Sequence, residues 1–168
     1  MCYTLFVFNL PNLHPAVVHF PIALLLLASA AGCLYLVALQ RTELRILTWW
    51  PMALGWLGGI VAVLTGLLAQ SGLPPAAPYR SVLNWHIGSG LAVLLVYGWL
   101  LYQGWLYGTA RARRRRAQAG LSSVDLLDDP ANRWWVLVLL VVGACLVVVS
   151  GWNGGRLVYE WAVNVTIP

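Results

Sequence analysis

The chain has 168 residues, of which 61% are hydrophobic and only 9% are charged. A soluble globular domain carries roughly a quarter charged residues, so this composition excludes a soluble fold and predicts an integral membrane protein in contact with the lipid bilayer. The formal net charge is +5, and all ten basic residues are arginine.

Four stretches are long and apolar enough to cross a membrane, since a spanning helix needs about 20 mostly apolar residues. They cover residues 16–39, 47–73, 82–107 and 134–152. The predicted fold class is therefore all-α, an integral membrane four-helix bundle, with residues 1–168 forming a single transmembrane domain. No positive segment precedes the first stretch, unlike in a secretory signal peptide, and we expect it to be retained.

The first span begins in a segment rich in histidine and proline. We expect His14 to cap this helix or to lie at the membrane interface, with Pro15 at the first helical position, where a missing N–H costs nothing. Pro21 lies within the helix and cannot donate to the carbonyl of Val17, which leaves that oxygen free at the level of His19. Because an ionisable ring is costly in hydrocarbon, His19 is a candidate for a functional site.

Small residues form a stripe along one face of the second span. Gly55, Gly59, Ala62 and Gly66 follow one another at intervals of four, three and four residues. Such a stripe lets a neighbouring backbone approach closely, and it would also leave room for a flat cofactor. The connection before this span, residues 40–45, is short and predicts that the first two helices are antiparallel neighbours.

The segment 109–133 is the one sizeable polar stretch, and five arginines lie within residues 111–116. A run of this kind beside a span usually anchors topology; binding to anionic lipid or to the acidic face of a partner is the alternative, and nucleic acid is not an expected partner. The positive-inside rule makes this loop cytoplasmic and puts both termini on the outer side. Residues 157–168 are too few to span and are predicted to lie in the interface.

This topology places the starts of the first and third spans at the same leaflet. His19 and His86 then lie at a similar shallow depth, and Arg156, at the end of the fourth span, reaches the same level. Two facing imidazoles could ligate the iron of a haem b, and the arginine could pair with a propionate. Hydrogen bonds from the rings to free carbonyls, another metal, or a quinone contact are the alternatives.

No nucleophile triad, paired-carboxylate site or phosphate-binding loop is present in the sequence, so we expect no catalytic chemistry of the chain's own. The spans also contain no carboxylate. Ion pumps and transporters generally need acidic or histidine relays within the bilayer, which makes a small transporter the weakest hypothesis.

Three motifs in this order resemble the DUF2231 family of small predicted bacterial membrane proteins with four spans. They are the stretch from Leu13 to Leu25, which includes HPAVVHFPIALL, then Trp85-His86 with Gly90, and finally GGRLVY at residues 154–159. The resemblance implies a four-span architecture in a bacterial inner membrane, and the family's histidine pattern implies haem or metal binding. Trp161 stands where the family usually has another histidine, so a site built on that residue is lost or altered.

Two functions of different classes follow. The first is a cytochrome b-like subunit that holds haem b and takes part in electron transfer. The second is a non-catalytic accessory subunit of a larger respiratory or photosynthetic membrane complex, since ten tryptophans and seven tyrosines favour extensive contacts with lipid, pigment or partner helices. Other membrane subunits are expected partners in both cases.

Overall fold

The computed structural model describes residues 10–163 except 72, 122 and 124. Its long helices are α1 (Leu10–Val37), α2 (Thr42–Gln70), α3 (Arg80–Gly108) and α5 (Arg133–Tyr159), and its shorter elements are α4 (Ala110–Gln118) and the 3₁₀ turn η1 (Leu126–Asp128). The part of the chain that the structure describes contains no strand, which confirms the all-helical fold class.

Each of the four long helices is apolar and long enough to cross a membrane. The longest two have 29 residues, and at about 1.5 Å per residue they reach roughly 43 Å. The hydrocarbon core of a bilayer is about 30 Å thick. The ends of these helices therefore extend into the headgroup regions on both sides.

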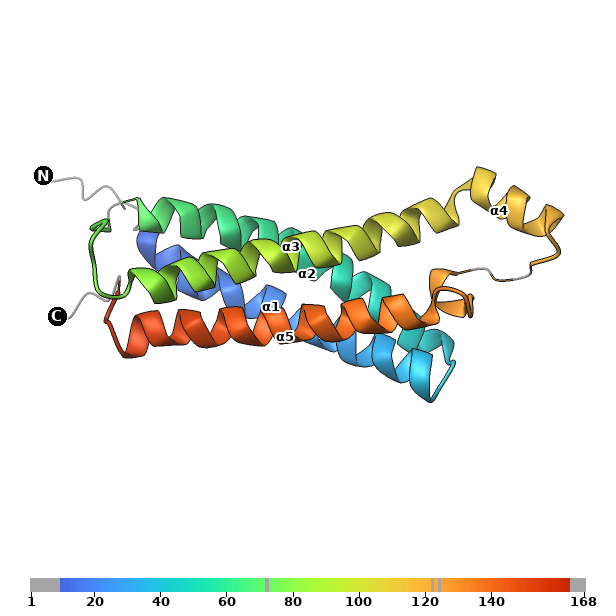
Figure 1. Ribbon diagram of the computed structural model, residues 1–168, viewed down its shortest axis with the longest axis horizontal. Coiled ribbons are helices and arrows are strands. Elements are labelled where there is room, and N and C mark those ends of the chain that lie inside the picture. The colour runs from blue at the N-terminus through green and yellow to red at the C-terminus, as the bar shows by residue number, and fades with distance from the viewer. Residues whose placement is uncertain (1–9, 72, 122, 124, 164–168) are drawn as a thin grey trace, which may run out of the picture.

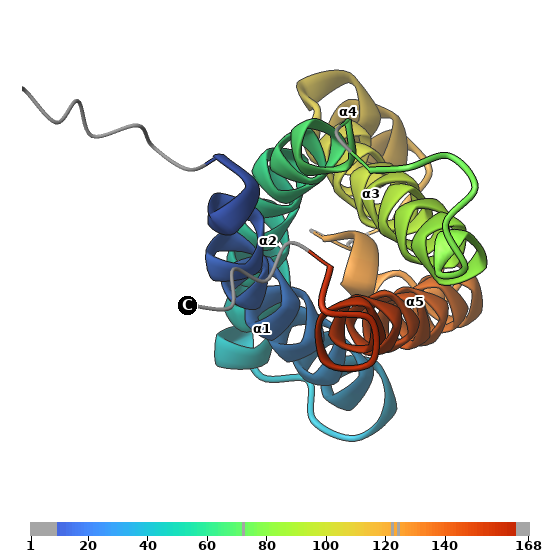
Figure 2. The same cartoon turned by 90° about the vertical axis from the view of Figure 1, so that its left-hand side faces the viewer.

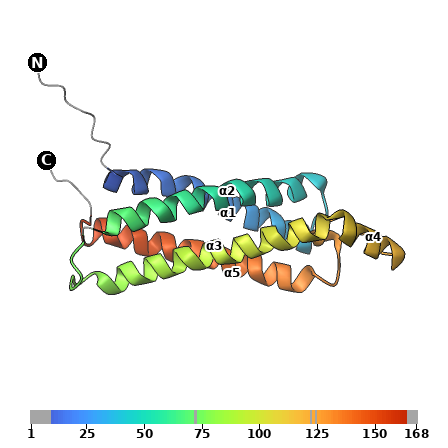
Figure 3. The same ribbon diagram turned by 90° about the horizontal axis from the view of Figure 1, so that it is seen from above.

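The four helices run side by side along one long axis, and the first and last described residues, 10 and 163, lie at the same end of the bundle (Figure 1). We call this end, where residues 10 and 163 lie, the termini end, and the opposite end, with the α1–α2 connection and η1, the loop end. Seen down the axis, the helices follow the cyclic order α1, α2, α3, α5 (Figure 2). The antiparallel pair α1–α2, which the short connection predicted, packs against the antiparallel pair α3–α5 (Figure 3).

The two hairpins repeat one packing pattern. Buried residues of α2 and α5 recur at the same intervals of four, three and four; they are Thr48, Met52, Gly55 and Gly59 in α2, and Val136, Leu140, Gly143 and Val147 in α5. Within α1 and α3, a histidine is followed at the same sequence separation by a tyrosine, which gives His14 and Tyr35 in one and His86 and Tyr107 in the other. The bundle is therefore built from two similar halves.

The small-residue stripe of α2 does pack closely. A Cβ added at Gly55 would lie 2.9 Å from Cγ of Leu25 on α1, and one at Gly59 would lie 3.0 Å from Cδ2 of Leu94 on α3. At the centre of the bundle, the fully buried hydroxyl of Tyr97 lies 2.7 Å from Oγ of Ser29, a hydrogen bond between α3 and α1. A polar pair in hydrocarbon is satisfied only within the protein.

The loop end is closed by three aspartates of the connection before α5, which we call the acidic clasp (Asp125, Asp128 and Asp129). Asp128 accepts hydrogen bonds from Tyr35 of α1 and from Nη1 of Arg45 of α2, the latter at 3.1 Å. Trp49 Nε1 donates to Asp125 at 3.1 Å, and Tyr107 donates to Asp129 at 3.0 Å. The buried Leu126 and Leu127 fill the space between the helices. The clasp therefore ties α1, α2 and α3 together.

Helix boundaries differ from the predicted spans mainly at three places. α2 begins at Thr42 rather than at residue 47, within the predicted connection 40–45. α1 begins at Leu10 rather than at residue 16, with Pro11 in its first turn, where no N–H is needed. α5 continues to Tyr159 rather than ending at Trp152, so Leu157 is buried in a helix and not part of an interfacial tail. Of that tail, residues 164–168 lie outside the described residues. Glycines lower the helix propensity near this end, but Gly154 allows close packing against α3, since a Cβ added there would lie 2.9 Å from Cε1 of His86.

Replacing Asp128 by Asn should destabilise the protein by about 1 to 2 kcal/mol, because it removes the charge that Arg45 and Tyr35 bind in a partly buried place. Unfolding of the purified protein in a mild detergent measures this. Glu160→Gln is the matched control, since Glu160 also binds an arginine but at an exposed position, where an ion pair contributes little to stability. Equal effects of the two changes would show that the clasp does not stabilise the bundle.

Candidate functional site

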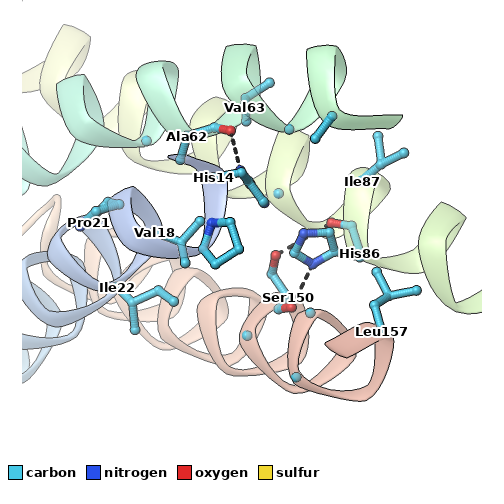
Figure 4. Close-up of a pocket in the computed structure, with 18 of the residues that line it drawn as sticks. His14, Val18, Pro21, Ile22, Ala62, Val63, His86, Ile87, Ser150 and Leu157 are labelled. Atoms are coloured by element: carbon cyan, nitrogen blue, oxygen red, sulfur yellow. Dashed lines mark hydrogen bonds between the residues drawn. The ribbon is translucent and has the colours of Figure 1, made fainter. Parts of the chain in front are cut away.

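Two imidazoles face each other inside the bundle at the termini end. The ring of His14 comes from α1 and that of His86 from α3; their centroids lie 5.9 Å apart, and their planes are inclined by 78°. Figure 4 shows both rings pointing toward each other across a pocket. Among the described residues, no other ring of α1 lies against a ring of α3. We therefore take these two imidazoles as the centre of the candidate site.

Both histidines are held by the same kind of hydrogen bond. Nδ1 of His14 donates to the carbonyl of Ala62 on α2 at 2.9 Å, and Nδ1 of His86 donates to the carbonyl of Ser150 on α5 at 2.9 Å. A carbonyl oxygen can only accept, so Nδ1 carries the proton in each ring. In the neutral imidazole, Nε2 then holds a lone pair and is free to accept a hydrogen bond or to bind a metal.

A glycine makes room for each ring. A Cβ added at Gly66, one helical turn after Ala62, would lie 2.9 Å from Cε1 of His14; a Cβ at Gly154, one turn after Ser150, would lie 2.9 Å from Cε1 of His86. Both distances are too short for any side chain. Carbonyl, glycine and imidazole therefore form the same arrangement in each hairpin.

The rings border a cavity of about 360 Å³, a volume within the usual range for small-molecule sites. Its walls are mostly apolar, and every long helix contributes to them. Small or aliphatic lining residues include Val18, Ile22, Gly90, Leu94 and Gly151. The site is thus an apolar chamber with two imidazole rings in its wall.

Of the two histidines predicted as a pair, only His86 takes the predicted place. His19 lies at the edge of the cavity, is exposed, and donates from Nδ1 to the carbonyl of Pro15 in its own helix at 2.8 Å. The ring that faces His86 is that of His14. Residues five apart on a helix are about 140° apart around it, so one histidine of the two must turn away when the other faces inward.

The role expected for His14 depended on where the first helix begins. With a start near residue 16, His14 would have been a capping residue; because α1 begins at Leu10, His14 lies in the second turn and reaches α2. The signal that could have located this start is Pro11, since proline is frequent in the first turn of a helix.

Arg156, which was predicted to pair with a haem propionate, forms an ion pair with Glu160. Its Nε donates to both carboxylate oxygens of Glu160 at 3.0 Å, and it does not line the cavity. Arg80, in the first turn of α3, has a buried Nη1 without a hydrogen-bond partner among the described residues. Trp161, where a further histidine was expected from the family resemblance, packs near the ring of Tyr79 at 6.1 Å between centroids.

Within residues 10–163, the described part contains no group of three or more histidine, cysteine, aspartate or glutamate residues that could hold a metal ion. The site therefore offers two protein ligands at most. Structural zinc requires four and catalytic zinc three.

A family model described as a predicted membrane protein, DUF2231, matches residues 10–167. Neither the curated proteins nor the solved structures contain a match to the chain.

The close approach of each imidazole to a glycine can be tested by adding a methyl group at that glycine. Gly66→Ala and Gly154→Ala should each destabilise the protein by about 1 to 3 kcal/mol, the usual cost of overpacking. Thermal unfolding in detergent checks this. Gly88→Ala is the control, because nothing lies within 4 Å of a Cβ at that position, and alanine there should be neutral or stabilising by up to about 1 kcal/mol. Unfolding temperatures that do not differ among the three variants would contradict the close approach.

Proposed function

The chain belongs to the DUF2231 family of predicted membrane proteins, and we propose that it holds a haem b between His14 and His86 and takes part in electron transfer within the membrane. The observation that carries the proposal is the hydrogen bonding of the two rings. Each Nδ1–H is bound to a carbonyl, which leaves two Nε2 lone pairs in the wall of one apolar cavity. A polar nitrogen in apolar surroundings is costly unless a donor or an electrophile binds it.

The separation of the rings supports a shared metal. An imidazole nitrogen lies about 2 Å from a transition metal that it binds, so two imidazoles that share one metal would have centroids no more than roughly 6 Å apart. The centroids of His14 and His86 are 5.9 Å apart. Histidines that bind metals also commonly donate their other ring N–H to a backbone carbonyl, as both do here.

The number of protein ligands favours haem over a simple ion. A porphyrin would supply the remaining ligands itself, so that His14 and His86 would suffice to hold it. When bound, it would supply one-electron redox chemistry. His14 and His86 would hold it, the glycines of α2 and α5 would leave room beside the rings, and the apolar walls would exclude water.

An arginine would pair with the propionates. Arg156, the residue predicted from the sequence, binds Glu160 in a helical turn and could do so only by leaving that partner. Arg80 does not line the cavity either, but it lies on the same helix as His86 and nearer the termini end, and its buried Nη1 has no acceptor among the described residues. Arg80 is therefore the better candidate, since a buried guanidinium is stabilised by a carboxylate.

We place the protein in the inner membrane of a bacterium, and the distribution of arginines supports an orientation with the loop end in the cytoplasm. The loop end carries Arg41, Arg45, Arg133 and the five arginines of α4, whereas the termini end carries Arg80 and Arg156. Positively charged loops are retained on the cytoplasmic side. The haem would then lie near the outer leaflet, where a periplasmic carrier or another membrane subunit could exchange electrons with it.

The absorption spectrum of the protein purified gently from membranes tests the proposal. Reduced minus oxidised spectra should contain the Soret and alpha bands of a b-type haem, and His14→Ala and His86→Ala should each abolish them, because one axial ligand is lost. His19→Ala is the matched control and should keep both bands.

Loss of the bands in His19→Ala but not in His14→Ala would restore the pairing predicted from the sequence and refute the present one. A wild-type preparation without any haem, which also fails to take up added haemin, would favour the second candidate, a non-catalytic accessory subunit of a larger membrane complex.

A further inference from the structure

The arginine run has a structure of its own. It forms α4, which lies beyond the end of α3 at the loop end of the bundle (Figures 1 and 3). Thr109 separates the two helices; its backbone is extended, and its side chain accepts a hydrogen bond from the N–H of Ala112 at 3.3 Å. The arginines are therefore held on a capped helix next to the end of a membrane span.

One arginine of the run fastens α4 to α3. Nη2 of Arg116 donates to the carbonyl of Tyr107 at 2.7 Å, and its guanidinium carbon lies 3.5 Å from the centroid of the Tyr107 ring. Such a contact between a cation and an aromatic ring fixes the helix in place. The guanidinium group of Arg116 therefore binds within the protein, to Tyr107.

The other four arginines of α4 are exposed and have no acidic neighbour within the helix; they are Arg111, Arg113, Arg114 and Arg115. The aspartates of the acidic clasp bind other groups, among them Arg45, Trp49 and Tyr107. Four positive charges therefore lie together on a short helix without an internal counter-charge.

Aromatic side chains indicate the depth of this helix in the bilayer. Trp99, Tyr102 and Trp105 form a ladder along α3, with successive ring centroids 5.9 and 6.1 Å apart and exposed fractions of 51%, 48% and 67%. Exposed tryptophan and tyrosine lie at the boundary between hydrocarbon and headgroups. The headgroup layer is roughly 5 to 8 Å thick on each side, and α4 begins five residues, or about 7.5 Å, beyond Trp105.

From charge and depth together we infer that α4 binds the anionic phospholipid headgroups of the leaflet at the loop end. The four exposed guanidinium groups would contact lipid phosphates, with the forked geometry that suits them to phosphate oxygens. Arg116 would act as the anchor that keeps these groups at headgroup level. An acidic protein or a nucleic acid would instead have to approach from the water, beyond the layer in which α4 begins.

The test uses the purified full-length protein in an uncharged detergent and a short-chain fluorescent phosphatidylglycerol, with phosphatidylcholine of the same chain length for comparison. Phosphatidylglycerol should bind on the order of tenfold more tightly. Changing Arg111, Arg113, Arg114 and Arg115 to glutamine together should weaken its binding by tenfold or more, because each basic residue near an anionic surface contributes to the attraction.

Two further variants make the result specific. Changing the same four arginines to lysine keeps the charge and should keep phosphatidylglycerol binding within a few-fold, and this variant remains informative if the glutamine variant does not fold. Arg156→Gln removes a positive charge at the opposite end and should leave binding unchanged.

Equal binding of the two lipids, or phosphatidylglycerol binding that survives in the glutamine variant, would overturn the inference. So would complete competition by inorganic phosphate at the concentration of the lipid, which would identify a site for free phosphate. An acidic peptide or an oligonucleotide that displaces the lipid at lower concentration would identify a macromolecular partner instead.

Discussion

The structure depends on the hydrogen bonds that polar groups form within the protein, because hydrocarbon offers them no other partner. Some polar side chains within the spans meet this requirement by bonding to a neighbouring helix, and others, such as His19, bond to a carbonyl of their own helix. Tyr97 meets Ser29, Trp56 donates to the carbonyl of Leu94, and both inward-facing histidines donate to carbonyls of the adjacent helix. These bonds link helices that apolar packing alone would leave free to slide, since lipid tails are as apolar as the side chains.

The repeat of one arrangement in both hairpins explains why the site lies where it does. A carbonyl, a glycine one turn later and a histidine on the partner helix recur in α1–α2 and in α3–α5. When the two hairpins pack together, their histidines meet between them. The same symmetry places a tyrosine from each hairpin on the acidic clasp at the other end. The extra segment with α4 and η1 interrupts only the second hairpin, and this gives the loop end its charge.

The sequence was sufficient for the fold, because apolar length and short connections determine how many helices cross and which are antiparallel. It was less informative about the site. The depth of His86 followed from the start of the third span, but the choice between His14 and His19 required the rotational position of α1, and hydropathy does not report rotation. The helical state of α4 was also missed, since a run of arginines is compatible with a loop until Thr109 and Arg116 are seen to hold it.

The division of the two imidazoles between separate hairpins has a thermodynamic consequence. Neither half contains a complete pair, so a molecule that contacts both rings can bind only after the halves have docked. Any such ligand lowers the free energy of the assembled bundle and leaves that of the separated hairpins unchanged, and the stabilisation grows with ligand concentration. A ligand bound between the two imidazoles would therefore hold the two hairpins together.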